Sequence, residues 1–200
     1  MLFQSFFAHQ SIEMQKKYIT SQKLLKDSFS LAKNIAESAY KPTFILGLWR
    51  GGAPIAIAVH EVLEFCKIPC NHYSLRISSY SGIENQAPSI KIFGLNDFKS
   101  LIKPQDNLLI VDDVHDTGLS MQTLLDEINS ITTVKSTKIA VLYYKPNKSK
   151  VDFEPDFYIE KESDWLVFPH EICGLNKNEL LNDKPEINHI RDLLMNTSKA

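Results

Sequence analysis

One stretch, residues 108–120, constrains the fold of this chain more than any other. Residues 108–111 form an uninterrupted aliphatic run, typical of a strand that is buried on both faces of a parallel sheet. The run is followed directly by Asp112 and Asp113, then by a short Asp-Thr-Gly turn, and from 121 to 128 apolar residues recur at helical spacing. The stretch therefore predicts a strand that ends at the acids, a loop, and a helix.

The predicted loop suits two different parts of one ligand. A helix that begins after a glycine-containing turn has free backbone amides at the positive end of its dipole, which favours a phosphate, and Thr117 and Ser120 add hydroxyl groups. Asp112 and Asp113 repel phosphate, but they accept hydrogen bonds from sugar hydroxyls and help to hold Mg²⁺. We infer a site for a ribose 5-phosphate. An acidic turn that merely caps a helix would use the same residue types, so that interpretation stays open.

Other phosphate-binding motifs are absent from the sequence. It has no G-x-x-x-x-G-K-[ST] motif for a triphosphate and no G-x-G-x-x-G motif for a dinucleotide.

The stretch resembles the phosphoribosyl-diphosphate (PRPP) loop of type I phosphoribosyltransferases, with its hydrophobic strand, two acids, two variable residues and Thr-Gly turn closed by Ser or Thr. With Asp at position 116, the motif resembles that of the branch that acts on 6-oxopurines, because adenine and uracil enzymes of the family usually carry alanine at this position. The resemblance implies that Asp116 is the acid/base group facing N7 of the purine, and that Asp112 and Asp113 hold the ribose hydroxyls. It assigns the 5-phosphate to Thr117, Gly118, Leu119 and Ser120.

A second motif follows another predicted strand. Residues 43–48 are largely apolar and lead into Trp49, Arg50 and two glycines, before an apolar helix at 55–65. Glycines let the backbone approach a ligand closely, although Arg-Gly-Gly alone equally fits a plain strand-to-helix turn. Beside the first motif it resembles the family's diphosphate loop, which implies diphosphate contacts from Arg50 and Gly51 and a cis peptide bond between Trp49 and Arg50. Trp49 departs from the smaller residue usual in bacterial relatives.

A polar segment after the third predicted strand, 71–77, is the candidate mobile loop. Residues 78–88 contain glycine and proline and are long for a connection inside a compact domain, which fits either a functional loop or a surface loop without function. In the purine enzymes a Ser-Tyr pair opens a loop that closes over the diphosphate. Ser79 and Tyr80 resemble that pair, which implies that closure excludes water from the reaction.

The last third of the chain carries the residues that the resemblance assigns to the base. Lys145 follows the buried strand 138–144, where ligands sit in open α/β sheets, although a solvated strand-end lysine is also common. The resemblance makes Lys145 the reader of purine O6. After a short predicted strand at 155–160, it implies that Trp165 stacks on the base, Leu166 offers backbone contacts and Glu171 supports a second Mg²⁺. His170 departs from the aromatic residue often found before that acid.

Some residues receive a structural interpretation instead. His115 lies at a variable position of the acidic loop, and we expect it at the surface or in an interface. Residues 12–40 lack Gly and Pro and predict one or two helices. The apolar N-terminus (Leu2, Phe3, Phe6, Phe7) fits packing against the body or a neighbouring subunit, or alternatively a flap over the site.

Composition excludes several other classes of protein. The chain has 22 basic and 24 acidic residues, so no general basic field attracts nucleic acid or a membrane surface. Its three cysteines form no C-x-x-C, and we expect free thiols in a reducing cytoplasm. No secretory leader or membrane-spanning run is evident.

Together these features predict one α/β domain with a mainly parallel sheet: a helical extension (1–40), a core (43–160), and a hood with a C-terminal helix (161–200). The resemblance implies transfer of the phosphoribosyl group from PRPP to N9 of hypoxanthine, guanine or xanthine, giving IMP, GMP or XMP with Mg²⁺ as cofactor, in a homodimer or homotetramer. Two alternatives stay open. One is a non-catalytic regulator on this fold that senses PRPP or a nucleotide. The other is a phosphorylatable receiver domain, in which Arg-Gly-Gly and the Ser-Tyr pair have no role.

Overall fold

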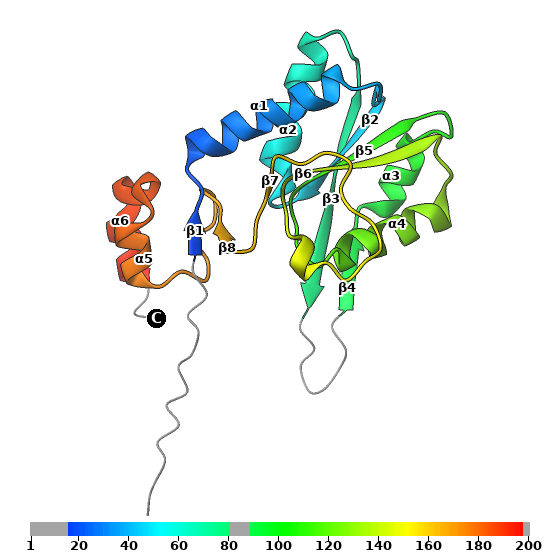
Figure 1. Ribbon diagram of the computed structural model, residues 1–200. Coiled ribbons are helices and arrows are strands. Elements are labelled where there is room, and N and C mark those ends of the chain that lie inside the picture. Colours follow the sequence, from blue (N-terminus) through cyan, green and yellow to red (C-terminus); the bar gives the residue numbers. More distant parts are fainter. Residues whose placement is uncertain (1–15, 81–88, 198–200) are drawn as a thin grey trace, which may run out of the picture. The chain divides into compact units, whose positions relative to one another are not determined.

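The computed structural model of the protein describes residues 16–80 and 89–197 (Figure 1). It divides the chain into two compact units. One is Thr20–Ser163, and the other combines Met1–Ile19 with Asp164–Ala200. The organisation as a single domain stays a prediction, and the apolar N-terminal residues Leu2, Phe3, Phe6 and Phe7 lie outside the described residues.

The larger unit is built on a six-stranded sheet in the order β4-β3-β2-β5-β6-β7 (Figure 1). Only β4 runs antiparallel to its neighbour, and the other pairings are parallel. This arrangement confirms the predicted α/β class with a mainly parallel sheet. The strands are β2 (Phe44–Trp49), β3 (Asn71–Tyr80), β4 (Ser89–Phe93), β5 (Asn107–His115), β6 (Ser136–Tyr144) and β7 (Glu160–Lys161).

Helices cover both faces of this sheet. On one face, Phe98 and Leu124 pack with Leu46 and Ile110 of the two central strands in a common apolar core. On the opposite face Gly47 lies against Ala56, because neighbouring strand residues point to opposite sides. The helices are α1 (Ser21–Glu37) and α2 (Gly52–Phe65), which pack on each other, and α3 (Leu95–Leu101) and α4 (Leu119–Ile131), with a 3₁₀ turn η1 (Pro146–Lys148).

The central strand β5 is longer than the sequence indicated. Its aliphatic residues 108–111 are fully buried, as expected for a strand covered on both faces. However, β5 does not end at the acids. It continues to His115, because backbone pairing with β6 depends little on the side chains and joins Val114 to Tyr143 and His115 to Tyr144. The two aspartates therefore lie in the carboxyl-terminal part of β5, where pairing with β6 fixes their backbone.

The short strand expected at 155–160 is mostly irregular. Only Phe157 bridges to Ala140 of β6, and regular pairing begins at Glu160. Asp156 accounts for part of this, since its carboxylate accepts a hydrogen bond from the Ile139 amide at 2.8 Å in place of a ladder partner.

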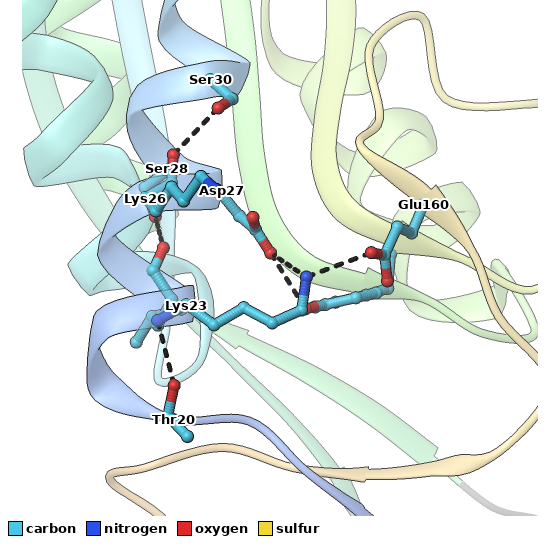
Figure 2. A network of polar contacts seen from close by, with 9 residues as sticks. Thr20, Lys23, Lys26, Asp27, Ser28, Ser30 and Glu160 are labelled. Carbon is cyan, nitrogen blue, oxygen red and sulfur yellow. Dashed lines mark hydrogen bonds and ion pairs between the residues drawn. The ribbon is translucent and has the colours of Figure 1, made fainter.

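A polar network joins α1 to the sheet (Figure 2). Thr20 caps α1 by accepting a hydrogen bond from the Lys23 amide. The Lys23 ammonium then bridges Asp27 at 2.8 Å and Glu160 at 3.1 Å, and the Tyr143 hydroxyl donates to Asp27 at 3.2 Å. Asp27 is nearly buried, so these partners compensate the cost of its desolvation. The network anchors α1 beside the ends of β6 and β7.

The smaller unit contains a two-stranded parallel sheet, β1 (Lys16–Tyr18) with β8 (Trp165–Val167). The strand β1 lies where the sequence predicted only helix, and its pairing with β8 explains this, since Ile19 continues the ladder by donating to Val167. The remaining elements are α5 (Lys177–Asn182), the 3₁₀ helix η2 (Pro185–Ile190) and α6 (Arg191–Thr197). Within the described residues, no helix combines the length and apolarity needed to cross a membrane.

Candidate active site

The loop between β5 and α4 encloses a small cavity at the carboxyl end of the sheet. Gly118 adopts a left-handed conformation with φ of 77° and α4 starts at the next residue, Leu119. The cavity has a volume of about 120 Å³, enough for a few atoms of a ligand. Its lining comprises Asp112, Val114, His115, Asp116, Thr117, Gly118, Ser120 and Met121. Of the residues assigned to ribose and phosphate, only Asp113 and Leu119 are absent from this lining.

The turn requires glycine at position 118 for two reasons. A side chain at a φ of this sign is strained, and a Cβ would also lie 2.4 Å from Val151 and 2.8 Å from Nε2 of His115. Lys150 donates its amide to the Thr117 carbonyl at 2.9 Å, which ties the turn to the segment after η1. This bond fixes the turn before α4, and Gly118 and Ser120 at the start of the helix line the cavity.

His115 is not a surface residue, contrary to the expectation from the sequence. It is 2% exposed and packs edge-on against Tyr144 and Phe153, at centroid distances of 5.5 and 5.6 Å. Burial lowers the pKa of its imidazole, and the nearby Asp116 carboxylate opposes that shift. Neither ring nitrogen has a hydrogen-bond partner among the described residues. The aromatic neighbours, which come from distant parts of the chain, explain the inward orientation.

The acidic pair is held in a tight local geometry. The Asp113 amide donates to Oδ1 of Asp112 at 2.9 Å, and the Val114 amide donates to Oδ1 of Asp113 at 2.8 Å. Burial raises the pKa of Asp112 well above its ordinary range, and the adjacent Asp113 charge adds to the shift. Two neighbouring carboxylates of this kind favour a ligand that brings hydroxyl donors or positive charge.

The loop after β2 lies directly against this acidic pair. A Cβ on Gly51 would lie 1.8 Å from Oδ2 of Asp113, and one on Gly52 would lie 2.4 Å from the Val111 carbonyl oxygen. The two glycines therefore permit a close approach between two loops, in addition to the close approach of a ligand that the sequence suggested. The peptide bond between Trp49 and Arg50 is cis, as the resemblance implied, and Arg50 is exposed at the start of α2.

Asp116 and Lys145 form an ion pair across the ends of β5 and β6. Nζ of Lys145 lies 3.2 Å from Oδ2 of Asp116, and the Lys145 amide donates to the His115 carbonyl at 2.9 Å. The Lys145 side chain is almost fully buried, whereas the Asp116 side chain is 39% exposed. A buried ammonium and a partly exposed carboxylate thus meet beside the cavity, with the carboxylate open to an incoming ligand.

The structure describes the remaining predicted site residues of the larger unit only in part. Ser79 and Tyr80 are the last residues of β3, where their backbone pairs with Ile90 and Ser89 of β4. They lie two strands from β5 at the same end of the sheet. Residues 81–88 of the candidate mobile loop lie outside the described residues, so the proposed closure stays a prediction.

In the smaller unit, β8 carries Trp165 and Leu166, two of the three residues assigned to the base. Trp165 is 48% exposed and Leu166 is buried. Oε2 of Glu171 accepts a hydrogen bond from the Phe168 amide at 2.9 Å, so one oxygen of this carboxylate is already engaged. His170 is exposed and stacks on Phe168 at 5.8 Å. The assignment of Trp165 and Leu166 to the base stays a prediction.

The donor set near the loop fits a hydrated Mg²⁺ better than a metal held by protein alone. No cluster of three or more His, Cys, Asp or Glu side chains suited to a metal occurs within residues 16–80 and 89–197. Mg²⁺ usually keeps several waters and takes one or two carboxylates together with substrate phosphates. Asp112 and Asp113 can supply those carboxylates.

Sequence reasoning missed two contributors to this site, namely the contact of Gly52 with the β5 backbone and the burial of His115. The glycine doublet was a visible signal for the first. No signal in the sequence shows the second, because it depends on Tyr144 and Phe153 meeting the loop in space.

Comparison with known proteins gives consistent matches. A family model described as "Phosphoribosyl transferase domain" matches residues 14–174. Hypoxanthine-guanine phosphoribosyltransferase of Cricetulus griseus is 33% identical over 133 residues, which is 66% of this chain and 56% of that protein. The human protein of the same name is 32% identical over the same length. The chain thus spans little more than half the length of these curated relatives.

Solved structures agree with these sequence matches. Purine phosphoribosyltransferase from Pyrococcus horikoshii superimposes with a TM-score of 0.65 at 29% identity, over 81% of this chain and 98% of that one. The xanthine-guanine-hypoxanthine phosphoribosyltransferase of Helicobacter pylori gives a TM-score of 0.60 at 21% identity, over 77% and 92% of the two chains. The latter supports the fold alone.

Proposed function

Since this chain belongs to the phosphoribosyltransferase family, with relatives named for purine substrates, we propose that it transfers the 5-phosphoribosyl group of PRPP to N9 of a 6-oxopurine. The products are diphosphate and IMP, GMP or XMP, which places the protein in purine salvage in the cytoplasm. The observation that carries the proposal is the Asp116–Lys145 pair beside the cavity of the β5–α4 loop.

The pair matches one edge of a 6-oxopurine, where O6 and N7 are adjacent. An ammonium group can only donate hydrogen bonds, so Lys145 suits the carbonyl O6 and disfavours the amino group that adenine carries there. Asp116 is partly exposed and 3.2 Å from Lys145, so its carboxyl can reach the neighbouring N7 and exchange a proton with it. The same two side chains that form an ion pair in the free protein would thus contact the two atoms of the base.

The PRPP part of the site follows from the neighbouring loops. Asp112 and Asp113 accept hydrogen bonds from the ribose hydroxyls, and the turn from Thr117 to Ser120 at the start of α4 receives the 5-phosphate. As the bond to diphosphate breaks, the sugar acquires positive charge, and the two carboxylates lie where they stabilise it. The 6-oxopurine N9 then forms the new bond to C1 of the ribose as diphosphate leaves.

The leaving diphosphate is assigned to Arg50, Gly51, Ser79 and Tyr80. Arg50 is exposed at the start of α2, and no ion pair involving it occurs in the described part of the chain, so it is available to an anion. Mg²⁺ bound with PRPP would neutralise diphosphate charge, with Asp112 and Asp113 as its protein contacts and Glu171 as a contact for a second ion. In the hood, the exposed Trp165 offers a face for stacking on the base and Leu166 offers backbone contacts. We propose that the functional form is a homodimer or homotetramer.

An assay of the purified protein with PRPP and Mg²⁺ tests the proposal. Each of hypoxanthine, guanine, xanthine and adenine is supplied in turn, and nucleotide formation is followed by absorbance. We expect turnover of at least one oxopurine, none of adenine, and loss of turnover in Asp116→Asn. Binding of PRPP or GMP without turnover of any base would contradict the proposal and favour a nucleotide-sensing regulator on the same fold.

A further inference from the structure

Lys184 is the most unusual charged residue of the smaller unit, because its long side chain is buried. It lies between α5 and η2 and is 2% exposed. Burial of an ammonium group is costly unless it donates hydrogen bonds to fixed acceptors. Burial lowers the pKa of this amine, and the carboxylates of Glu186 and Glu171 oppose the shift, so both acids face it. The burial of this ammonium group therefore calls for a structural or functional explanation.

The Lys184 ammonium donates to the carbonyl oxygen of Phe168. That carbonyl also accepts the Glu171 amide at 3.0 Å, while the Phe168 amide donates to Oε2 of Glu171 at 2.9 Å. Residues 168–171 thus form a turn that is closed twice by its own groups and a third time by Lys184. The stacking of His170 on Phe168 adds to its order. A turn with this many fixed contacts has very little conformational freedom.

This turn immediately follows β8, the strand of three residues that carries Trp165 and Leu166. A strand this short is weakly defined by its own ladder. On one side β8 pairs with β1, where Lys17 aligns with Leu166, and at its end it is held by the turn at 168–171. The direction of β8 in its unit therefore depends in part on where the turn is anchored, and Lys184 anchors it from outside the strand and turn.

We propose that Lys184 is a positioning residue for recognition of the purine base, acting through the Phe168–Glu171 turn on the backbone of β8. This inference rests on the proposed function, because it takes β8 as the part of the hood that contacts the base. Lys184 itself contacts no ligand. Its removal is expected to weaken binding of the base and to leave binding of the ribose phosphate unchanged.

Two ligands separate these effects in a binding experiment. Calorimetric titration of the full chain with GMP measures base and ribose phosphate together, and titration with ribose 5-phosphate measures the second part alone. Lys184→Met keeps the apolar stem of the side chain and removes the donor. We expect it to weaken GMP binding at least tenfold and to change ribose 5-phosphate binding less than twofold. Lys177→Met, at an exposed lysine of the same unit, is the matched control and should change neither.

A second variant covers the possibility that Lys184→Met fails to fold. Lys184→Arg retains a cationic donor, and we expect it to restore most of the GMP affinity. Hydrogen exchange of the Glu171 amide gives an independent readout, since this amide donates to the same carbonyl and should exchange faster in Lys184→Met than in Lys177→Met.

Equal losses for GMP and ribose 5-phosphate, or unchanged GMP binding with a faster-exchanging Glu171 amide, would overturn the inference and leave Lys184 a purely structural residue. A failure of the proposed function is distinguishable from this, because it would appear in the unmodified protein, either as absent binding of both ligands or as binding without turnover of any base.

Discussion

The two ends of the parallel sheet in the larger unit treat their polar groups differently. At the amino end of β2 and β5, Thr43 donates to Oδ1 of Asp106 at 2.7 Å and the Lys103 amide donates to Oδ2 at 2.8 Å. Asn107 in turn accepts a hydrogen bond from Ser136 at 2.7 Å and donates to the Lys41 carbonyl at 2.9 Å. Each of these polar groups at the start of β2 and β5 has a partner, as in most protein interiors.

The carboxyl end of the same strands lacks this saturation. Asp112 and Asp113 lie side by side with the pKa of Asp112 raised, and both nitrogens of His115 have no partner among the described residues. The polar groups at the amino end of β2 and β5 satisfy one another, whereas the carboxyl end retains electrostatic and hydrogen-bonding capacity that a ligand can use. We infer from this difference that the ligand site lies at the carboxyl end of the sheet. Five predictions test it.

The largest expected effect concerns Asp116. Asp116→Asn keeps the shape of the side chain and removes its ability to take and return a proton, so kcat should fall by about 10² to 10⁴. The melting temperature should fall modestly, because the amide oxygen still accepts a hydrogen bond from the buried Lys145 ammonium but no longer compensates its charge. Steady-state kinetics and GMP titration check this together. If GMP binding fell as much as kcat, Asp116 would be a binding residue instead of the acid/base group.

The next largest expected effect concerns Gly51 and Gly52, which let the loop after β2 lie against the acidic pair at the end of β5. Gly52→Ala would place a Cβ 2.4 Å from a backbone carbonyl that cannot move freely, and should cost about 1–3 kcal/mol of stability. In Gly51→Ala the obstacle is the Asp113 side chain, which can rotate, so stability should fall less and PRPP affinity more. Denaturant unfolding and PRPP titration of both variants measure the contrast. The reverse order would show that the Asp113 position is unimportant for PRPP.

At the saturated end of the sheet, Asp106→Ala should act on stability alone. It leaves the Thr43 hydroxyl and the Lys103 amide without their acceptor, which is expected to cost about 1–3 kcal/mol. The kcat of the folded fraction should equal that of the unmodified protein. Urea unfolding and initial rates check this, and a lower kcat at full folding would contradict the division between the two ends.

Asp112→Asn should have the opposite effect on stability at the other end. Because burial and Asp113 raise the pKa of Asp112, an ionised carboxylate there is disfavoured in the free protein. An amide of the same shape removes this repulsion and should stabilise the free protein by about 0.5–2 kcal/mol. The melting temperature without ligand measures it. A lower melting temperature would mean that Asp112 is structurally satisfied.

The smallest expected effect is a pH dependence of stability from His72 on β3. Burial and the neighbouring His60, whose ring centroid is 5.2 Å away, lower the pKa of His72. Below about pH 6.5 the His72 imidazole binds a proton in the unfolded chain, whereas in the folded protein it stays neutral to lower pH. Stability therefore decreases as the pH falls. His72→Leu should show a smaller decrease between about pH 7 and pH 5 than the unmodified protein. His189→Gln, at an exposed site, should behave like the unmodified protein.

The sequence predicted the parts of the fold that depend on local pattern. The aliphatic run at 108–111 specified a buried strand, and the glycine-containing turn with helical spacing after it specified the start of α4. The loops after β2 and β5 could be anticipated because a short motif carries each one. The extension of β5 through His115 could not, because it is decided by pairing with β6.

The smaller unit was harder to predict for the same reason. The strands β1 and β8 have three residues each and come from opposite ends of the chain, so neither has a periodicity of its own. Lys184 lies in a polar stretch that is typical of a surface, and its burial follows only from the turn at Phe168. Likewise the network of Lys23, Asp27 and Glu160 in Figure 2 joins residues that no local pattern connects.

The most direct test of this account is a calorimetric titration of PRPP with Mg²⁺ into three proteins: the unmodified chain, Asp112→Asn and Asp106→Ala. If the carboxyl end of the sheet binds the ribose phosphate, PRPP affinity should fall about tenfold or more in Asp112→Asn, as expected for a lost charged hydrogen bond. It should stay within about twofold in folded Asp106→Ala, because the amino end makes no ligand contact. Equal affinity in all three proteins, or a larger loss in Asp106→Ala, would contradict the assignment of the site to the carboxyl end.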